Sequence, residues 1–268
     1  MKSVILCGGQ GTRIRDVADD LPKPMIRVGE RPILWHIMHT YAAAGIKDFV
    51  LCLGYKSWSI KEYFINFHAQ VADCALRLGE PGRIDYGAAP FPEWDWRVEL
   101  VETGLNSMTG ARLWRVRDNL AAEDLFCMTY GDGLADLDVG KVVEFHRRHG
   151  RVGTVTGVRP AGRFGVMTIA DADDGSTISA FAEKPQAGEG LINGGFFVFD
   201  RRVFDYMDDD PGLVFEQAPL QRLAADGQLM MFEHGGFWQP MDTFREWKML
   251  NDMWDTHDAP WERPGMRV

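Results

Sequence analysis

The sequence has few cysteines and no long apolar segment, and each shortage excludes a class of protein. Four of the 268 residues are cysteine, they are scattered, and none forms a C-x-x-C pair. This argues against a disulfide framework or a zinc site and predicts reduced, buried thiols. The apolar run at the amino end stops at Gly8, too short for a secretory segment of about 7–15 apolar residues or a membrane span of about 20. We therefore expect a cytoplasmic protein without a membrane partner.

Positive charge is also scarce. The net charge is −10 at pH 7, from 29 Lys and Arg against 39 Asp and Glu, which argues against nucleic acid as the main partner. Residues 1–31 are the exception, because six basic and four acidic side chains give this segment +2 and leave −12 for the rest of the chain. A basic segment on an acidic body suits a small polyanionic ligand held at one site.

Familiar nucleotide-binding and catalytic motifs are missing too. The glycine-rich segment 8–13 is neither G-x-x-x-x-G-K-[ST] nor G-x-G-x-x-G, and no Ser–His–Asp or Cys–His arrangement stands out. What is present is a predicted strand, Lys2–Cys7, followed at once by these glycines. Their backbone N–H groups are open to phosphate or base atoms, and in an open α/β sheet such a loop lies where ligands bind.

Alternating strand and helix patterns predict an α/β fold with parallel pairing. Ile33–Ala44 has apolar residues at helical spacing and ends at Gly45, and Ser59–Glu62 is a capping-box pattern that opens a second helix. Residues 71–104 predict a hairpin-like excursion or lid rather than a separate domain. Further strands are predicted at Phe49–Leu53, Cys74–Leu78, Arg97–Glu102, Asp124–Tyr130, Val152–Val158, Phe164–Ile169, Ile178–Glu183 and Ile192–Phe199, and further helices at Met108–Leu120, Asp138–His149, Phe215–Ala225 and after Asp242.

Two charged residues stand at positions that suit phosphate chemistry. Lys23 lies between Pro22 and Pro24, which hold the backbone extended and stiff, so its ammonium can present a fixed charge to a triphosphate. Asp132 lies between two glycines at a predicted strand end. Mg²⁺ usually takes one or two protein carboxylates and completes its shell with phosphate and water, and the glycines leave room for that assembly.

Together these segments resemble the sugar nucleotidyltransferases. The resemblance rests on GGQGTR followed nine residues later by Lys23-Pro24, and continues through ETG, SMTGAR, YGDGLADLD, EKP, INGGFFVF and FWQPMDT. Within the family, the chain is most similar to the branch that uses CTP and glucose 1-phosphate. The resemblance implies a Rossmann-like, mostly parallel sheet flanked by helices, a single domain over 1–268, Mg²⁺ as cofactor, and CTP or another pyrimidine triphosphate plus a sugar 1-phosphate as partners.

The resemblance also implies roles for individual residues. Asp242 joins Asp132 as a metal ligand, because Thr243–Glu246 is itself a capping box that can start the last helix without it. Asp136-Leu-Asp138 is interpreted as a strand exit and helix cap, and Arg13, Lys23 and Asp132 as catalytic. The nucleotide-binding residues are Leu6, Gly8, Gly9, Gly11, Thr12, Arg13, Lys23, Ser107, Thr109 and Arg112, and the sugar-phosphate residues are Gly165, Glu183, Lys184, Asn193 and Gly194.

Several alternatives stay open. One is a thymidylyl- or uridylyltransferase, or an enzyme for another sugar 1-phosphate. Ser107–Arg112 resembles the cytidylyl branch and the Q-P-x-P-x-G-L-A run of the other branches is missing, whereas Gln10 departs from the usual pattern of the nucleotide loop. The others are a non-catalytic, nucleotide-sensing subunit and a D-x-D glycosyltransferase. Homo-oligomerisation is left open.

Overall fold

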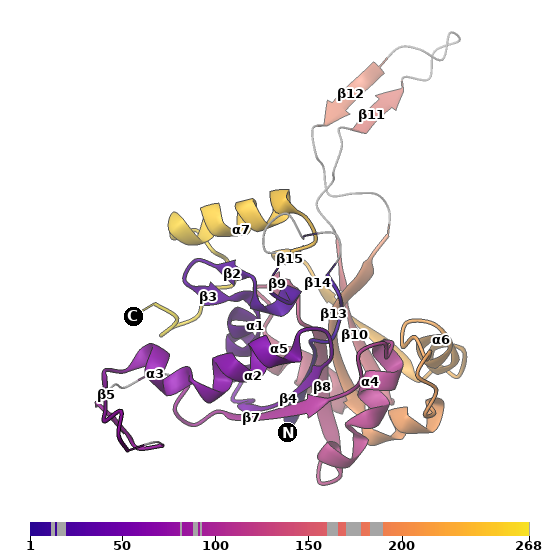
Figure 1. Ribbon diagram of the computed structural model, residues 1–268. Coiled ribbons are helices and arrows are strands. Elements are labelled where there is room, and N and C mark those ends of the chain that lie inside the picture. The colour runs from indigo at the N-terminus through magenta and orange to yellow at the C-terminus, as the bar shows by residue number, and fades with distance from the viewer. Residues whose placement is uncertain are drawn as a thin grey trace.

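A computed structural model describes residues 1–11, 14, 20–80, 82–87, 91, 93–159, 166–169, 178–182 and 190–267. At its centre lies a seven-stranded sheet in the order β14-β10-β13-β8-β1-β4-β7, with helices against both faces (Figure 1). Neighbouring strands are parallel except where β13 pairs with β8 and β10. The predicted fold class, a mostly parallel sheet flanked by helices, is confirmed.

The elements have the following bounds. The strands of the central sheet are β1 (Lys2–Leu6), β4 (Asp48–Leu53), β7 (Arg97–Glu102), β8 (Leu125–Tyr130), β10 (Gly153–Val158), β13 (Ile192–Asp200) and β14 (Leu229–His234). The two-stranded sheets are β2 (Arg27–Val28) with β3 (Arg31–Pro32), β5 (Cys74–Leu76) with β6 (Ile84–Tyr86), β9 (Gly133–Ala135) with β15 (Trp238–Pro240), and β11 (Val166–Ile169) with β12 (Ile178–Ala182). The helices are α1 (Ile33–Ala42), α2 (Ser57–Ile65), α3 (Phe67–Val71), α4 (Thr109–Arg115), α5 (Val139–His149), α6 (Ala218–Ala225) and α7 (Phe244–Asp255), with 3-10 turns η2 (Lys23–Met25), η3 (Arg117–Leu120) and η4 (Arg201–Tyr206).

The inner strands of the central sheet bury both of their faces, and successive side chains alternate between two core clusters. In β1, Ile5 packs in the cluster that includes α1 and α5, whereas Val4 packs in the cluster that includes α4 and α6. In β13, Phe196 belongs to the first cluster, and Phe197 and Phe199 to the second. These three phenylalanines are buried core residues, as the sequence predicts.

Helix-end signals predict several boundaries correctly. The Asp138 side chain accepts a hydrogen bond from the N–H of Lys141 at the start of α5, and Gly150 ends that helix in the left-handed conformation. Thr243 and Glu246 form the predicted capping box of α7. Helix α1 begins at Ile33, with Pro32 as its extended N-cap, and ends at Ala42.

Two local predictions are wrong. Helix α2 begins at Ser57 rather than at Ser59, because the turn before it places left-handed Lys56 at the N-cap, and no side-chain hydrogen bond caps the helix. Ser59 already lies inside the first turn, where its N–H donates to the carbonyl of Lys56. Cys74 is exposed rather than buried, because it lies on a two-stranded hairpin, β5–β6, whose residues are all exposed.

The segment 71–104 contributes to two different sheets, the central sheet through β7 and the β5–β6 hairpin. Strand β7 pairs in parallel with β4 and forms an edge of the central sheet, so it is not part of an excursion. The β5–β6 hairpin lies well to one side of the sheet in Figure 1. The sequence does not predict β6, whose three residues lie between two glycines, Gly82 and Gly87.

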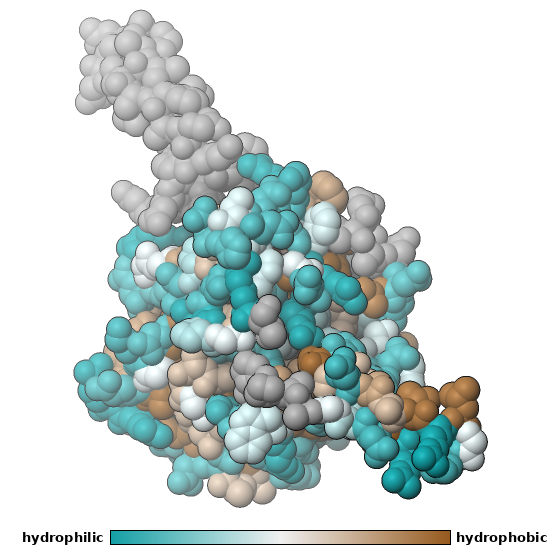
Figure 2. Space-filling view, turned by 90° about the vertical axis from the view of Figure 1, so that its left-hand side faces the viewer, coloured by the Kyte–Doolittle hydropathy of each residue, from teal (hydrophilic) through white to brown (hydrophobic). Residues whose placement is uncertain are grey.

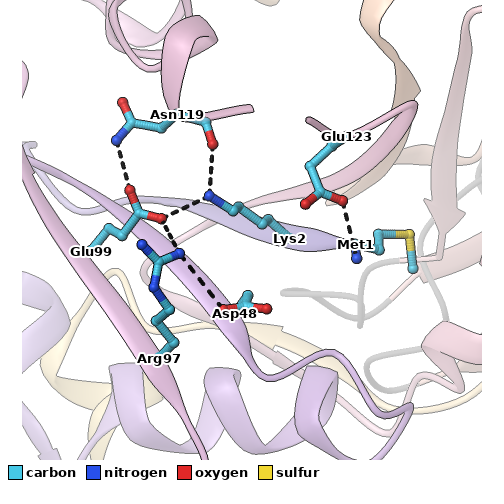
Figure 3. Close-up of polar contacts among 7 residues, drawn as sticks. All are labelled: Met1, Lys2, Asp48, Arg97, Glu99, Asn119 and Glu123. Atoms are coloured by element: carbon cyan, nitrogen blue, oxygen red, sulfur yellow. Dashed lines mark hydrogen bonds and ion pairs between the residues drawn. The ribbon is translucent and has the colours of Figure 1, made fainter. Parts of the chain in front are cut away.

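A polar network ties the amino ends of three adjacent strands together (Figure 3). The Lys2 ammonium donates to Glu99 and to the Asn119 carbonyl, each over 2.7 Å, and the Asn119 amide donates to the other Glu99 oxygen. Arg97 pairs with Glu99 and, at 3.9 Å, with Asp48. These contacts join β1, β4 and β7 at the edge opposite the glycine-rich loop.

The coloured part of the face drawn in Figure 2 is mostly polar. Hydrophilic side chains dominate the coloured residues of the face in Figure 2, and apolar ones form small groups between them. Among the described residues, no helix combines the length and apolar character needed to cross a membrane.

Candidate active site

The carboxyl ends of β1 and β8 bring the glycine loop and Asp132 together. These strands are adjacent and parallel, so the residues that follow them leave the sheet side by side. The Gly131 N–H donates to the Leu6 carbonyl over 3.1 Å. Gly8 accepts a backbone hydrogen bond from Tyr55, which follows β4. Three strand ends therefore build one rim.

A cavity of about 300 Å³ opens at this rim. All eight predicted nucleotide-binding residues that the structure describes line it, and so does Asp132. The eight are Leu6, Gly8, Gly9, Gly11, Lys23, Ser107, Thr109 and Arg112. The structure thus gathers residues that are more than one hundred positions apart in the sequence.

Lys23 joins the two predicted metal ligands. Its Nζ lies 2.6 Å from Asp132 Oδ2 and 2.5 Å from Asp242 Oδ1. The lysine side chain is 12% exposed, and the two aspartates are 33% and 30% exposed. Burial by itself lowers the pKa of Lys23, but the charges and hydrogen bonds of both carboxylates outweigh it and raise that pKa above its ordinary value. Lys23 therefore stays a cation throughout the neutral range.

The short strands β9 and β15 place the two aspartates beside each other. They pair antiparallel with Gly133 opposite Pro240, so Asp132 and Asp242 extend from the same end of the ladder. The Met241 N–H donates to the Asp132 carbonyl over 2.9 Å. Glu246 accepts the N–H of Asp242, and α7 is capped by Thr243, so the Asp242 side chain is not the helix cap.

A second cavity, of about 370 Å³, shares Tyr130 and Asp132 with the first. Two of the predicted sugar-phosphate residues, Asn193 and Gly194, line it, as does Asp242. The Trp238 indole N–H donates to the Gly194 carbonyl over 2.7 Å, which fixes this wall. The two cavities meet where the acidic pair lies.

Arg112 is 4% exposed, and it makes its hydrogen bonds to protein oxygens. Its Nη1 donates to the Thr103 hydroxyl and to the carbonyls of Leu53 and Gly104, and its Nη2 donates to the carbonyls of Gly8 and Leu105, at 2.8–3.3 Å. A Cβ at Gly8 would stand 2.1 Å from this guanidinium. Glycine is therefore required at position 8 for the Arg112 guanidinium to pack against the loop and donate to the Gly8 carbonyl.

Some predicted site residues fall outside the part of the chain that the structure describes, and some residues that line the cavities were not predicted. Thr12, Arg13, Gly165, Glu183 and Lys184 fall outside the described residues. Tyr130, Glu216 and Trp238 line the second cavity without having been predicted. Tyr130 carried a signal, because it ends the strand directly before Gly131-Asp132. Glu216 precedes a helix far along the chain and carried none.

Comparison with known proteins identifies the family. The family model described as nucleotidyl transferase matches residues 2–243. The chain belongs to this family. It is 45% identical over 262 residues to the glucose-1-phosphate cytidylyltransferases of Salmonella typhi and Salmonella typhimurium, covering 98% of this chain and 99% of each relative.

A solved structure supports the fold. HddC from Yersinia pseudotuberculosis superposes with a TM-score of 0.65 at 20% identity, covering 94% of this chain and 99% of that one. The predicted resemblance and the enzyme class, nucleotidyltransferase, are confirmed by these matches.

Proposed function

We propose that this nucleotidyltransferase transfers the cytidylyl group of CTP to glucose 1-phosphate, giving CDP-glucose and pyrophosphate. The observation that carries the proposal is the meeting of two cavities at Lys23, Asp132 and Asp242. The substrate pair is supported by the relatives of 45% identity over nearly the whole chain, which are glucose-1-phosphate cytidylyltransferases.

The two cavities suit the two substrates. The first, lined by glycines whose N–H groups can meet phosphate oxygens, takes the triphosphate. The second, lined by Asn193 and Gly194, takes the sugar phosphate. In this arrangement the α-phosphate of CTP and the phosphate of the sugar meet at Asp132, which lines both.

The reaction needs charge neutralisation more than proton transfer. A phosphate monoester has its second pKa near ~6, so the attacking oxygen is already an anion at pH 7 and no general base is needed. Two polyanions must nevertheless meet, and charge moves onto the departing pyrophosphate. Lys23, held protonated by its carboxylate partners, supplies fixed positive charge at the meeting point, and such positioning carries most of phosphoryl-transfer catalysis. Arg13 and Lys184 are proposed to add to it on the nucleotide and sugar sides.

The acidic pair fits a divalent cation. Both carboxylates reach one point, the Lys23 ammonium, and both are about one third exposed. Mg²⁺ needs one or two protein carboxylates and takes its other oxygens from phosphate and water; among the described residues no cluster of three His, Cys, Asp or Glu side chains competes as a metal site. Asp132 and Asp242 would hold the ion, which when bound supplies charge stabilisation to the triphosphate.

We also propose that residues 1–268 act as one domain in the cytoplasm. The support for a single domain is that Lys23, near the amino end, pairs with Asp242, near the carboxyl end. A boundary between them would divide the site.

The test is pyrophosphate release from purified protein with Mg²⁺, over a grid of CTP, UTP, dTTP, ATP and GTP against the 1-phosphates of glucose, galactose and mannose. We expect the highest turnover with CTP and glucose 1-phosphate. Equal CTP and UTP should then compete for limiting enzyme, with CDP-glucose as the dominant product, because a site with hydrogen-bond partners for one base leaves buried groups unpaired with the other. Comparable amounts of CDP-glucose and UDP-glucose would contradict the preference for CTP. A lack of pyrophosphate release with every substrate pair would contradict the proposed function.

A further inference from the structure

Glu216 sits in the wall between the two cavities and holds a group from each. Its Oε2 accepts a hydrogen bond of 2.7 Å from the hydroxyl of Thr109, which lines the first cavity. Its Oε1 accepts one from the hydroxyl of Tyr130, which lines both. Glu216 itself lines the second cavity and is partly buried there.

The backbone fixes this carboxylate in place. The Phe215 N–H donates to the Thr109 hydroxyl over 2.9 Å. The Thr109 hydroxyl therefore accepts a hydrogen bond from Phe215 and donates one to Glu216. The N–H groups of Met108 and Gly110 donate to carbonyls of Pro211 and Leu213, which anchors the segment before Glu216 on α4. A Cβ at Gly110 would stand 2.7 Å from the Leu213 side chain, so the contact needs glycine.

The Tyr130 ring is equally constrained. A Cβ at Gly195 would lie 2.7 Å from it, so the ring rests against bare backbone. In this fixed position the Tyr130 hydroxyl donates its hydrogen bond to Glu216.

The charge of Glu216 limits what it can meet in the second cavity. Within the described part of the chain it makes hydrogen bonds to hydroxyls, and no Lys, Arg or His forms an ion pair with it. A carboxylate repels phosphate, but each of its oxygens can accept a further hydrogen bond. The ligand part that suits it is therefore an uncharged hydroxyl donor.

We propose that Glu216 is a sugar-specificity residue, which accepts a hydrogen bond from one ring hydroxyl of the sugar 1-phosphate. This inference rests on the proposed function. Through Thr109, the same carboxylate connects the wall of the sugar cavity to that of the nucleotide cavity.

The test compares Glu216→Gln with wild type on glucose 1-phosphate and on its 2-, 3-, 4- and 6-deoxyfluoro analogues. Fluorine cannot donate a hydrogen bond, and its electronic effect on the phosphate cancels in the ratio of variant to wild type. We expect the variant to raise KM for glucose 1-phosphate about tenfold, because a charged acceptor is lost, and to change KM for CTP less than about threefold. The penalty should vanish for the one analogue that lacks the contacted hydroxyl.

Tyr130→Phe is the matched control, because it removes a hydroxyl that Glu216 holds and leaves the carboxylate. Its penalty should be the same for all four analogues. Glu216→Asp keeps the carboxylate but shortens the side chain by one methylene, and it should show the same analogue-specific pattern. It replaces Glu216→Gln in the test if that variant does not fold. A uniform penalty, or none, in both Glu216 variants of an active protein would overturn this inference alone. A wild-type protein inactive with every substrate pair would overturn the proposed function and this inference with it.

Discussion

Gly131 touches the turn that carries Lys23: a Cβ built on Gly131 would stand 2.9 Å from Cγ of Pro24. The same Cβ would lie 3.1 Å from the Leu6 carbonyl oxygen. Neither neighbour is the free end of a flexible side chain. The glycine before Asp132 is thus what allows the turn at Lys23–Met25 to pack against the end of β8.

Gly131→Ala should therefore damage both stability and catalysis. Overpacking of this kind costs about 1–3 kcal/mol, which lowers Tm by several degrees in a chain of this size. Because the displaced Pro24 adjoins Lys23, kcat should fall about tenfold or more. Thermal melting and steady-state kinetics measure the two effects. Gly133→Ala is the control for stability, since a Cβ there meets nothing within 4 Å, and an equal loss of Tm in it would contradict the packing argument.

Asp132→Asn and Asp242→Asn should each lower kcat about a hundredfold or more, because each removes a carboxylate proposed to hold Mg²⁺. Helix α7 should keep its stability in Asp242→Asn, because Thr243 and Glu246 form its capping box. Kinetics at varied Mg²⁺ and thermal melting would be recorded for both variants. Near-normal turnover with a lowered Tm would show that Asp242 has a structural role only.

Arg112→Lys should lower the free energy of unfolding by about 3 kcal/mol, because an ammonium cannot serve the same set of buried oxygens. It should raise KM for CTP and UTP by the same factor, since Arg112 acts on the nucleotide cavity through the carbonyl of Gly8. Denaturant unfolding and both KM values check this. A change in the CTP to UTP ratio would instead indicate that Arg112 reads the base directly.

Stability should fall in mild acid because of His36. Burial lowers its pKa from 6.5 to about 3, while one ring nitrogen pairs with the Val28 carbonyl and the other with the Trp261 indole N–H. Below pH 6.5 the unfolded chain takes up a proton that the folded chain refuses, so between pH 6.5 and 5 this residue alone removes about 2 kcal/mol. Urea unfolding at pH 7 and pH 5 should show a smaller difference between the two pH values in His36→Gln. An unchanged difference would assign the acid loss to other groups.

The sequence predicts those parts of the fold whose signals are local. Strands β1 and β4 follow from short apolar runs, and α5 from an aspartate before it and a glycine after it. Strands β9 and β15 have three residues each and are held by one another across about a hundred positions, so neither carries a pattern of its own. The start of α2 is set by the left-handed turn at Lys56, which the serines after it do not reveal.

The site divides in the same way. The glycine loop and Asp132 stand out because glycines are concentrated at strand ends, and Lys23 stands out because prolines flank it. Glu216 does not, because its importance comes from Thr109 and Tyr130, which reach it from other elements. The burial of Arg112 beneath Gly8 likewise cannot be inferred from a helix pattern.

The wide spacing of Lys23, Asp132 and Asp242 along the chain has a consequence for folding during synthesis. Lys23 meets its partners 109 and 219 positions further along the chain. As a ribosome releases the chain, β1, β4, β7 and β8 all emerge before Asp242. The acidic pair cannot close on the lysine until β15 and the start of α7 have emerged. The contacts between Lys23 and the two aspartates therefore form late in synthesis. Incomplete chains should not react with nucleotide or sugar phosphate.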